Sequence, residues 1–346
     1  MTQIDTAPGA VQATPLDPQG ILRDLRPAVE VTQEAAALGK TLAAQIKRIY
    51  FVSCGAPNRV SLGMEYWLDH YHSPFEVKRY FPAEFMTLQP ELDQHTLVIL
   101  ASKSGTTAET VEAAKFLRDF DAITLAVTAT MEKPLAQFTT HVICIGDTEQ
   151  AHTGIFVALQ AVVAGLLADQ PRFPYEAVMQ SLPAVPGMLV EAAQLSDQRG
   201  KKDAERYRDD REFYHIAAGP VFATAYVFGV CMLMEMQWLH SVAFEAAEWF
   251  HGPFEIFDDK TPVLILLGED PSRPLAERAV TFCQRYSERV MVYDSRDFPM
   301  TGIAPEVRGI FAPYALQAAL NRFAEHLAEQ HNQSLDLRRY MWITEY

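Results

Sequence analysis

Short β-branched runs alternate with helix-length amphipathic segments along most of this chain, which is typical of a parallel sheet covered by helices. In the first half we predict strands at Ile49–Cys54, Glu76–Tyr80, Thr96–Ser102, Ile123–Thr128 and His141–Ile145. First-half helices are predicted near Val60–His72, Ala108–Asp119 and Thr153–Ala168. In the second half we predict strands at Phe213–Ala218, Pro262–Leu267 and Arg289–Asp294, with helices near Val221–His240, Pro274–Ser287 and Ala312–Gln330. The chain is therefore expected to be an α/β protein.

The two halves place their strands at matching intervals. Gly55 and Gly219, each at the end of a first strand, are 164 residues apart. The strands that begin at Thr96 and Pro262 are 166 residues apart, and the next pair of strands repeats that interval. These intervals indicate a duplicated α/β unit, with two unrelated domains of similar strand spacing as the alternative.

The length of 346 residues also allows two domains of roughly 150 residues each. Residues 1–18 are rich in proline, alanine and threonine and are expected to be a disordered tail. We place a first domain at residues 19–185 and a second at residues 186–346.

Charge limits the partners of this chain. Lys and Arg total 29 against 44 Asp and Glu, giving a net charge of −15. Such a surface repels nucleic acid and anionic lipid, so we expect neither as a partner. Residues 216–234 form an uncharged stretch long enough to cross a bilayer, but Gly219-Pro220 divides it into a strand end and a first helical turn. We therefore expect a buried helix there and no membrane span.

Four cysteines lie in or beside apolar runs and form no C-x-x-C pair: Cys54, Cys144, Cys231 and Cys283. This usage favours reduced thiols in a cytoplasmic protein, with a reactive Cys54 as the alternative. No targeting signal is visible. His70 and His72 are the only close histidine pair, and two residues apart on a helix they point to different faces, so we expect no metal site.

The segment Ala101–Thr110, ASKSGTTAET, follows an apolar strand and opens a helix. Its hydroxyls, its glycine and the backbone N–H groups of the helix N-terminus would converge on one point, an arrangement that binds anions. Neither a Walker loop nor a dinucleotide-binding glycine motif is present. Lys103 would add a charge to this phosphate site or point to solvent.

A capping box is the structural alternative for this segment. Thr106 would cap the helix and Glu109 would reach back from the third helical position. That arrangement leaves Ser102, Ser104 and Gly105 unexplained, so phosphate binding is the favoured interpretation.

A second group of candidates lies in the other half of the chain. Glu235 ends an apolar helix face, where burial would raise the pKa of a carboxyl towards acid/base use near neutral pH. His251 precedes Gly252-Pro253, which places its imidazole at a turn. A surface glutamate and an ordinary loop histidine are the alternatives.

Two motifs resemble the sugar isomerase (SIS) family of phosphosugar-binding proteins. S-x-S-G-x-T follows a strand at residues 102–107, and C-G follows the first strand. In that family the serine/threonine loop holds the sugar phosphate. The resemblance implies that the binding residues are Ser102, Ser104 and Thr107, with Cys54 and Gly55 at the neighbouring strand end.

The repeated unit also resembles the paired domains in the isomerase half of glucosamine 6-phosphate synthases. This resemblance implies two tandem SIS domains, each a flavodoxin-like three-layer sandwich with a parallel sheet between helices. The second copy has the loop Gly268–Ser272, GEDPS, where two carboxylates would repel phosphate. We therefore expect one phosphate site per chain.

Five segments resemble fructosamine 6-phosphate deglycases: IYFVSCGAP, LMEMQW, EWFHGPFEI, LLGEDPSRPLAERAVTF and RRYMWITEY. The resemblance covers about residues 46–346 and implies a homodimer that needs no cofactor and has its sites at the subunit interface. Its phosphosugar substrate would be hydrolysed to glucose 6-phosphate and a free amine. Glu235 would move a proton between C1 and C2, and His251, from its own subunit or its partner, would help open the sugar ring.

One departure from the related isomerases bears on the reaction. Their C-terminal lysine is absent, because residues 334–346 contain Arg338 and Arg339 but no lysine. Arginine stays protonated and cannot act as an amine nucleophile, although Arg339 would bind an anionic substrate. The missing lysine makes a sugar phosphate isomerase less favoured than a deglycase, so it is the alternative function. The non-enzymatic alternative is a phosphosugar-sensing regulator. The identity of the amine and the roles of Cys54 and Glu255 stay open.

Overall fold

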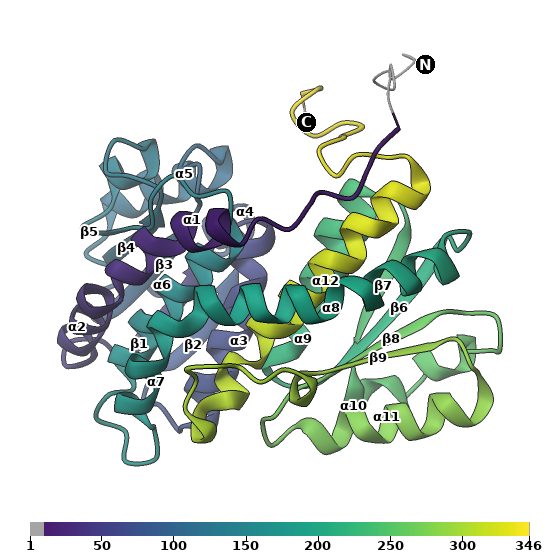
Figure 1. The fold of residues 1–346 in the computed structure, drawn as a ribbon. Helices are drawn as coiled ribbons and strands as arrows, with labels where there is room; N and C mark the ends of the chain where they lie inside the picture. Colours follow the sequence, from purple (N-terminus) through teal and green to yellow (C-terminus); the bar gives the residue numbers. More distant parts are fainter. Residues whose placement is uncertain (1–9, 346) are drawn as a thin grey trace. The chain divides into compact units, whose positions relative to one another are not determined.

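The computed structural model describes residues 10–345. Within this range two all-parallel β-sheets, of five and four strands, carry helices on their faces, which confirms the predicted α/β class (Figure 1). The chain forms two compact units, one around each sheet. The first-sheet unit comprises residues 17–188 and 300–311. The second-sheet unit comprises, within the described range, residues 10–16, 189–299 and 312–345.

The first sheet has the strand order β2-β1-β3-β4-β5. Its strands are β1 (Arg48–Val52), β2 (Glu76–Tyr80), β3 (Thr96–Ala101), β4 (Ile123–Thr128) and β5 (His141–Cys144). Every residue of β3 is buried, as expected for a central parallel strand with helices on both faces. Val52 pairs with Leu100, so the carboxyl ends of β1 and β3 lie side by side.

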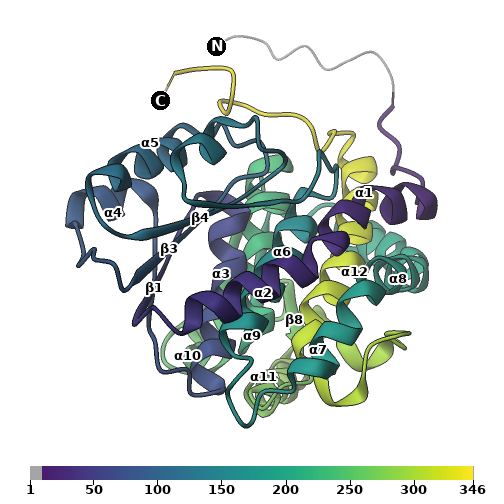
Figure 2. The same ribbon diagram turned by 90° about the vertical axis from the view of Figure 1, so that its left-hand side faces the viewer.

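The α-helices of this unit are α1 (Pro18–Glu30), α2 (Thr32–Ala43), α3 (Gly55–His70), α4 (Pro82–Leu88), α5 (Ala108–Phe116), α6 (Ala151–Leu166) and α7 (Tyr175–Ser181). Helix α2 packs against α6 (Figure 2). Two glycines lie at this contact. A Cβ atom on Gly39 would lie 2.2 Å from the Val162 oxygen, and one on Gly165 would lie 2.0 Å from the Ala36 oxygen. The missing side chains therefore allow the two backbones to touch.

The second sheet has the order β7-β6-β8-β9. Its strands are β6 (Glu212–Ala217), β7 (His240–Glu245), β8 (Val263–Leu267) and β9 (Val290–Asp294). This order repeats the first four strands of the other sheet when β6 is matched with β1 and β7 with β2. The helices of this half are α9 (Pro220–Val227), the π-helix η4 (Phe228–Met236), α10 (Ala246–Trp249) and α11 (Arg273–Tyr286).

Two long helices, α8 (Val185–Tyr207) and α12 (Arg308–His331), begin in the first-sheet unit and end in the second-sheet unit. Short 3₁₀ turns complete the fold: η1 (Leu117–Asp119), η2 (Pro134–Phe138), η3 (Leu182–Ala184), η5 (Pro253–Ile256), η6 (Ser295–Asp297) and η7 (Pro305–Val307). Residues 300–311, which we expected in the second domain, group with the first-sheet unit, where Ala304 N–H donates to Ser181 Oγ at 3.0 Å.

The expected disordered tail covers residues 1–18, of which residues 1–9 lie outside the described part of the chain. The described part is ordered against α12. Val11 N–H donates to Asn332 Oδ1 at 2.7 Å, and Thr14 N–H donates to Glu325 Oε2 at 3.0 Å. α1 already begins at Pro18. The proline-rich composition therefore misled the prediction for residues 10–18.

The predicted helix at Val221–His240 is correct only in part. It is an α-helix to Val227 and a π-helix from Phe228 to Met236, after which the chain turns into the edge strand β7. Strand β7 was not predicted. No helix among residues 10–345 is long and apolar enough to cross a membrane.

Candidate functional site

The loop after β3 gathers three hydroxyl groups at the start of α5. Ser102 Oγ lies 3.3 Å from Ser104 Oγ and 2.9 Å from Thr107 Oγ1. Gly105 N–H donates to Ser102 Oγ at 3.2 Å, and Thr106 N–H donates to Ser104 Oγ at 3.3 Å. The structure therefore brings together the three hydroxyl residues that the sequence singled out.

The alternative capping box does not form. Thr107 is the residue that precedes α5, and its side chain makes no capping hydrogen bond. Glu109 instead accepts a hydrogen bond from Cys54 Sγ at 3.8 Å. An uncapped helix N-terminus beside three hydroxyls is suited to an anion, because its N–H groups and dipole both favour negative charge.

Gly105 allows the tight course of this loop. Its φ of +62° lies in the left-handed region, and a Cβ atom there would lie 2.4 Å from Lys133 Cβ and 2.8 Å from Thr128 Oγ1. Its carbonyl accepts from Leu135 N–H at 3.0 Å. Any other residue at this position would force the loop away from the side chains of Lys133 and Thr128.

Lys103 leaves the hydroxyl cluster and pairs with a carboxylate. Its Nζ lies 2.6 Å from Asp147 Oδ1, and this hydrogen bond lowers the pKa of Asp147. The lysine charge is therefore already balanced, so the hydroxyls and backbone N–H groups are left as the main anion donors of the loop.

Cys54 and Gly55 follow β1, the neighbour of β3 in the sheet. Cys54 Sγ accepts from Thr110 Oγ1 at 3.8 Å and so faces the first turn of α5. Burial raises the pKa of the Cys54 thiol, which disfavours the reactive thiolate. Gly55 is exposed, and no atom lies within 4 Å of a Cβ built on it. Open space therefore adjoins this strand end.

In the second-sheet unit, a carboxylate of the loop after β8 occupies the position at the helix start where an anion would bind. Asp270 Oδ2 accepts the Ser272 N–H at 2.9 Å, at the start of α11. Glu269 Oε1 accepts from Ser295 Oγ at 3.0 Å. A carboxylate of the protein thus takes the hydrogen bond that a phosphate would take. One phosphate site per chain stays a prediction, which this contact favours.

Glu235 lies in the π-helix η4, whose last hydrogen bond runs from Gln237 N–H to Met232 O at 3.2 Å. π-Helical segments are rare and frequently occur at functional sites. The carboxylate pairs with the C-terminal tail, with Oε1 2.9 Å from Nη2 of Arg338. The side chains of Arg338 and Glu235 are only 9% and 23% exposed, so the ion pair is largely withdrawn from water.

Burial raises the pKa of the Glu235 carboxyl, and the Arg338 guanidinium opposes part of that increase. The carboxylate lines a cavity of about 550 Å³ together with Trp238, His240, Arg338 and Arg339. A buried carboxylate beside an open cavity is suited to act as a proton acceptor for a bound small molecule.

His251 lies at the opposite end of the second sheet from Glu235. The cavity at Glu235 includes His240, the first residue of β7, whereas His251 follows α10, which begins directly after β7. Six extended residues such as those of β7 span about 20 Å. His251 is exposed. The two predicted catalytic side chains of one chain therefore do not meet.

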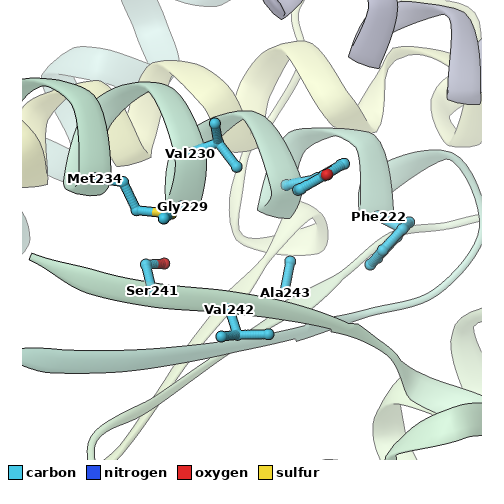
Figure 3. Close-up of a pocket in the computed structure, with 8 residues that line it drawn as sticks. Phe222, Gly229, Val230, Met234, Ser241, Val242 and Ala243 are labelled. Carbon is cyan, nitrogen blue, oxygen red and sulfur yellow. The ribbon is translucent and has the colours of Figure 1, made fainter. Parts of the chain in front are cut away.

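A second cavity, of about 470 Å³, lies between η4 and β7 (Figure 3). It shares Val230 and Met234 with the Glu235 cavity, and Ser241 and Ala243 point into it from β7. Ser241 Oγ lies 2.7 Å from Nε2 of the fully buried His215. Burial lowers the pKa of His215 to about 3, so its ring is neutral and ties β6 to β7.

The two other carboxylate candidates do not line the Glu235 cavity. Glu84 Oε2 accepts the Phe81 N–H at 3.3 Å and so caps α4, a structural role. Glu255 is exposed in η5. Among residues 10–345 there is no cluster of three or more histidine, cysteine or acidic side chains arranged to hold a metal ion.

Sequence reasoning missed two features of the Glu235 site. It named Arg338 only as a replacement for lysine, although its guanidinium is the partner of Glu235. It also passed over Trp238, whose ring lies 4.3 Å from the Arg339 guanidinium. The available signal was the pair of adjacent arginines after a long helix, because the amphipathic pattern of that helix does not account for them.

Comparison with known proteins gives the family of this chain. Residues 42–168 match the SIS domain family. The chain is 37% identical over 312 residues to fructosamine deglycase FrlB of Bacillus subtilis, covering 89% of this chain and 94% of that protein. It is 28% identical to the fructoselysine 6-phosphate deglycase of Escherichia coli, covering 85% of each.

A solved Bacillus subtilis structure described as a phosphosugar isomerase superposes with a TM-score of 0.83 at 35% identity, covering 95% of this chain and 99% of that one. The SIS match includes β1, β3 and the hydroxyl loop between β3 and α5. The chain therefore belongs to the SIS-domain family, as a relative of fructosamine deglycase FrlB.

Proposed function

We propose that this protein is a fructosamine 6-phosphate deglycase. It hydrolyses a phosphorylated fructosamine to glucose 6-phosphate and a free amino acid or amine, without a cofactor. The observation that carries the proposal is Glu235, a half-buried carboxylate with a raised pKa that is paired with an arginine in a cavity of about 550 Å³. The similarity to the two deglycases supports this reaction class.

In this proposal the phosphate binds to the hydroxyl loop of the first-sheet unit. Ser102, Ser104 and Thr107 supply hydroxyl donors, and the uncapped start of α5 supplies backbone N–H groups. Cys54 and Gly55 border the same edge of the sheet and would contact the sugar. We expect the binding energy of the phosphate to hold the reacting carbons in place.

His251 promotes opening of the sugar ring, and Glu235 then takes a proton from C1 of the open chain. Electrons of that C–H bond form a C1–C2 double bond, and the C2 carbonyl oxygen takes a proton from water to become a hydroxyl, giving an enaminol. Return of the proton from Glu235 to C2, with loss of the N–H proton to solvent, leaves an imine between C1 and nitrogen. Water adds to this imine and the amine leaves, so the reaction consumes one water and no other reactant.

We also propose two tandem SIS domains and a homodimer. The shared strand order of the two sheets supports the tandem arrangement, and the near-constant intervals between their strands support it independently. The position of His251 at the far end of β7 from Glu235 supports the homodimer. His251 would therefore act on the site of the partner subunit.

A sugar phosphate isomerase is the second candidate, favoured by the structural match to a protein described as a phosphosugar isomerase. It would use the same proton transfer without releasing an amine. One assay separates the two functions: incubation with phosphorylated fructosamines of lysine, asparagine and glycine, with detection of the free amino acid and of glucose 6-phosphate. Release of both in equal amounts supports the deglycase. Interconversion of fructose 6-phosphate and glucose 6-phosphate without amine release would overturn it.

A further inference from the structure

We propose that Arg339 and Trp238 form a subsite for a carboxylate on the amine part of the substrate, so that the enzyme prefers fructosamines of amino acids over those of uncharged amines. This inference rests on the proposed function, because it places the departing amine in the Glu235 cavity.

The two residues lie in the wall of that cavity. Arg339 and Trp238 line the same space of about 550 Å³ as Glu235. The guanidinium of Arg339 lies 4.3 Å from the centre of the Trp238 ring. Stacking on an aromatic face leaves the N–H edge of a guanidinium available to a ligand.

Within residues 10–345, Arg339 differs from its neighbour in having no anionic partner. Arg338 is committed to Glu235 at 2.9 Å and also donates to the carbonyls of Leu335 and Leu337. No ion pair or hydrogen bond of the Arg339 guanidinium is found within residues 10–345, and the side chain is exposed at the cavity wall. In a chain with a net charge of −15, an unpaired cation beside the reacting carboxylate is well placed to attract an anion.

The backbone holds Trp238 in a specific position. Its φ of +55° is uncommon for a large side chain, and such conformations persist where the surroundings enforce them. The residues on either side are anchored: Gln237 Nε2 donates to Gln333 O at 3.0 Å, and Leu239 N–H donates to Leu233 O at 2.9 Å. The ring is therefore a fixed platform, which reduces the entropy lost when Arg339 binds a ligand.

A carboxylate suits this platform because its two oxygens match the planar N–H edge of a guanidinium. The sugar phosphate is the other anion of the substrate, and it is assigned to the hydroxyl loop. An experiment must therefore distinguish a carboxylate on the amine from the phosphate.

The test compares two substrates that differ only in that carboxylate: the fructosamine 6-phosphates of glycine and of glycinamide. Wild-type protein, Arg339→Gln, Arg339→Lys and the control Arg285→Gln are assayed for amine release. Arg285 is exposed on α11, outside the cavity. The ratio of kcat/KM for the two substrates is taken for each protein, and the ratio of each variant is then divided by that of the wild type, which cancels the different intrinsic reactivity of the substrates.

We expect Arg339→Gln to lower the preference for the glycine compound by about ten- to a hundredfold relative to the wild type, through a higher KM for that compound, and Arg285→Gln to leave the preference unchanged. Arg339→Lys should recover part of the preference. An equal loss for both substrates in Arg339→Gln would assign this side chain to the sugar phosphate and overturn the inference. A ratio that Arg339→Gln leaves unchanged would also overturn it, whereas absence of amine release from both compounds would instead refute the proposed function.

Discussion

Arg338 Nη2 lies 2.9 Å from Glu235 Oε1, although the two residues are 103 positions apart in the chain. The ion pair joins a π-helix to the C-terminal tail and sets the basicity of the carboxylate. Burial raises the pKa of the Glu235 carboxyl, and the Arg338 guanidinium lowers it. Without Arg338 this pKa would therefore be higher still.

This relationship predicts a pH effect. A general base acts when deprotonated, so activity rises with pH through its pKa. Arg338→Gln removes the positive charge that stabilises the carboxylate, and the acid limb of the kcat profile should move to higher pH. Arg338→Lys keeps a charge and should restore most of the wild-type position. A limb that stays in place in Arg338→Gln would show that Glu235 is not the titrating group.

Removal of either proton-transferring side chain should lower the turnover rate severely. Glu235→Gln and His251→Ala should each lower kcat by about 10²–10⁴-fold, the usual contribution of a positioned acid or base. Circular dichroism and thermal unfolding of each variant confirm that the fold is intact. Near-full turnover of both folded variants would refute the catalytic assignment.

The separation of Glu235 and His251 within one chain predicts complementation. Co-folding of the Glu235→Gln and His251→Ala chains gives mixed dimers, in which one site has both functional groups if His251 acts across the interface. Random mixing should restore about one quarter of wild-type activity. Size-exclusion chromatography confirms the dimer, and a mixture as inactive as its components would exclude action across subunits.

Gly105 offers a test of the phosphate loop. Gly105→Ala introduces a side chain at a φ of +62° and 2.4 Å from Lys133 Cβ, so the loop must move. We expect glucose 6-phosphate to bind about tenfold or more weakly, measured by calorimetry. Gly302→Ala is a matched control, with a φ of +87° and a clash of 2.6 Å with Ala184 Cβ away from the loop. Both variants should lose stability, and equal losses of binding would contradict the assignment.

The buried histidine of the second sheet predicts acid sensitivity. Burial lowers the pKa of His215 from 6.5 to about 3, so between these values the unfolded chain takes up a proton that the folded protein does not. The free energy of unfolding therefore falls as pH falls below about 6.5, by roughly 2 kcal/mol for this group between pH 7 and pH 5. Urea titrations at both pH values measure it. His215→Gln should reduce that difference, and an unchanged difference would assign the acid sensitivity elsewhere.

The sequence was most informative where a pattern is local. The strands of the first sheet were predicted within one or two residues, because all except β2 are largely apolar runs between polar connections. The hydroxyl loop was recognised because its donors lie within six residues, 102–107. Strand β7 was missed because it follows closely on an apolar helix, so no polar connection marks where the helix ends and the strand begins.

Contacts between residues far apart in the chain could not be predicted from local sequence patterns. Nothing near Glu235 indicates that its partner is Arg338, because that pairing depends on how α12 returns the chain to η4. The same helix carries the chain from one unit to the other, so a division of the sequence at a single position could not describe both units. The π-helix was also invisible, since its composition is that of any apolar helix.

The π-helix around Glu235 has a consequence for how this protein is compared across evolution. A π-helix turns by a smaller angle per residue than an α-helix, because each of its hydrogen bonds spans one more residue. If residues 228–236 were α-helical at the same length, Glu235 would therefore point in a different direction around the helix axis. Glu235 would still align in sequence, but its side chain would no longer line the cavity. Among distant homologues, the helix type of this segment is thus as diagnostic of shared chemistry as the glutamate itself.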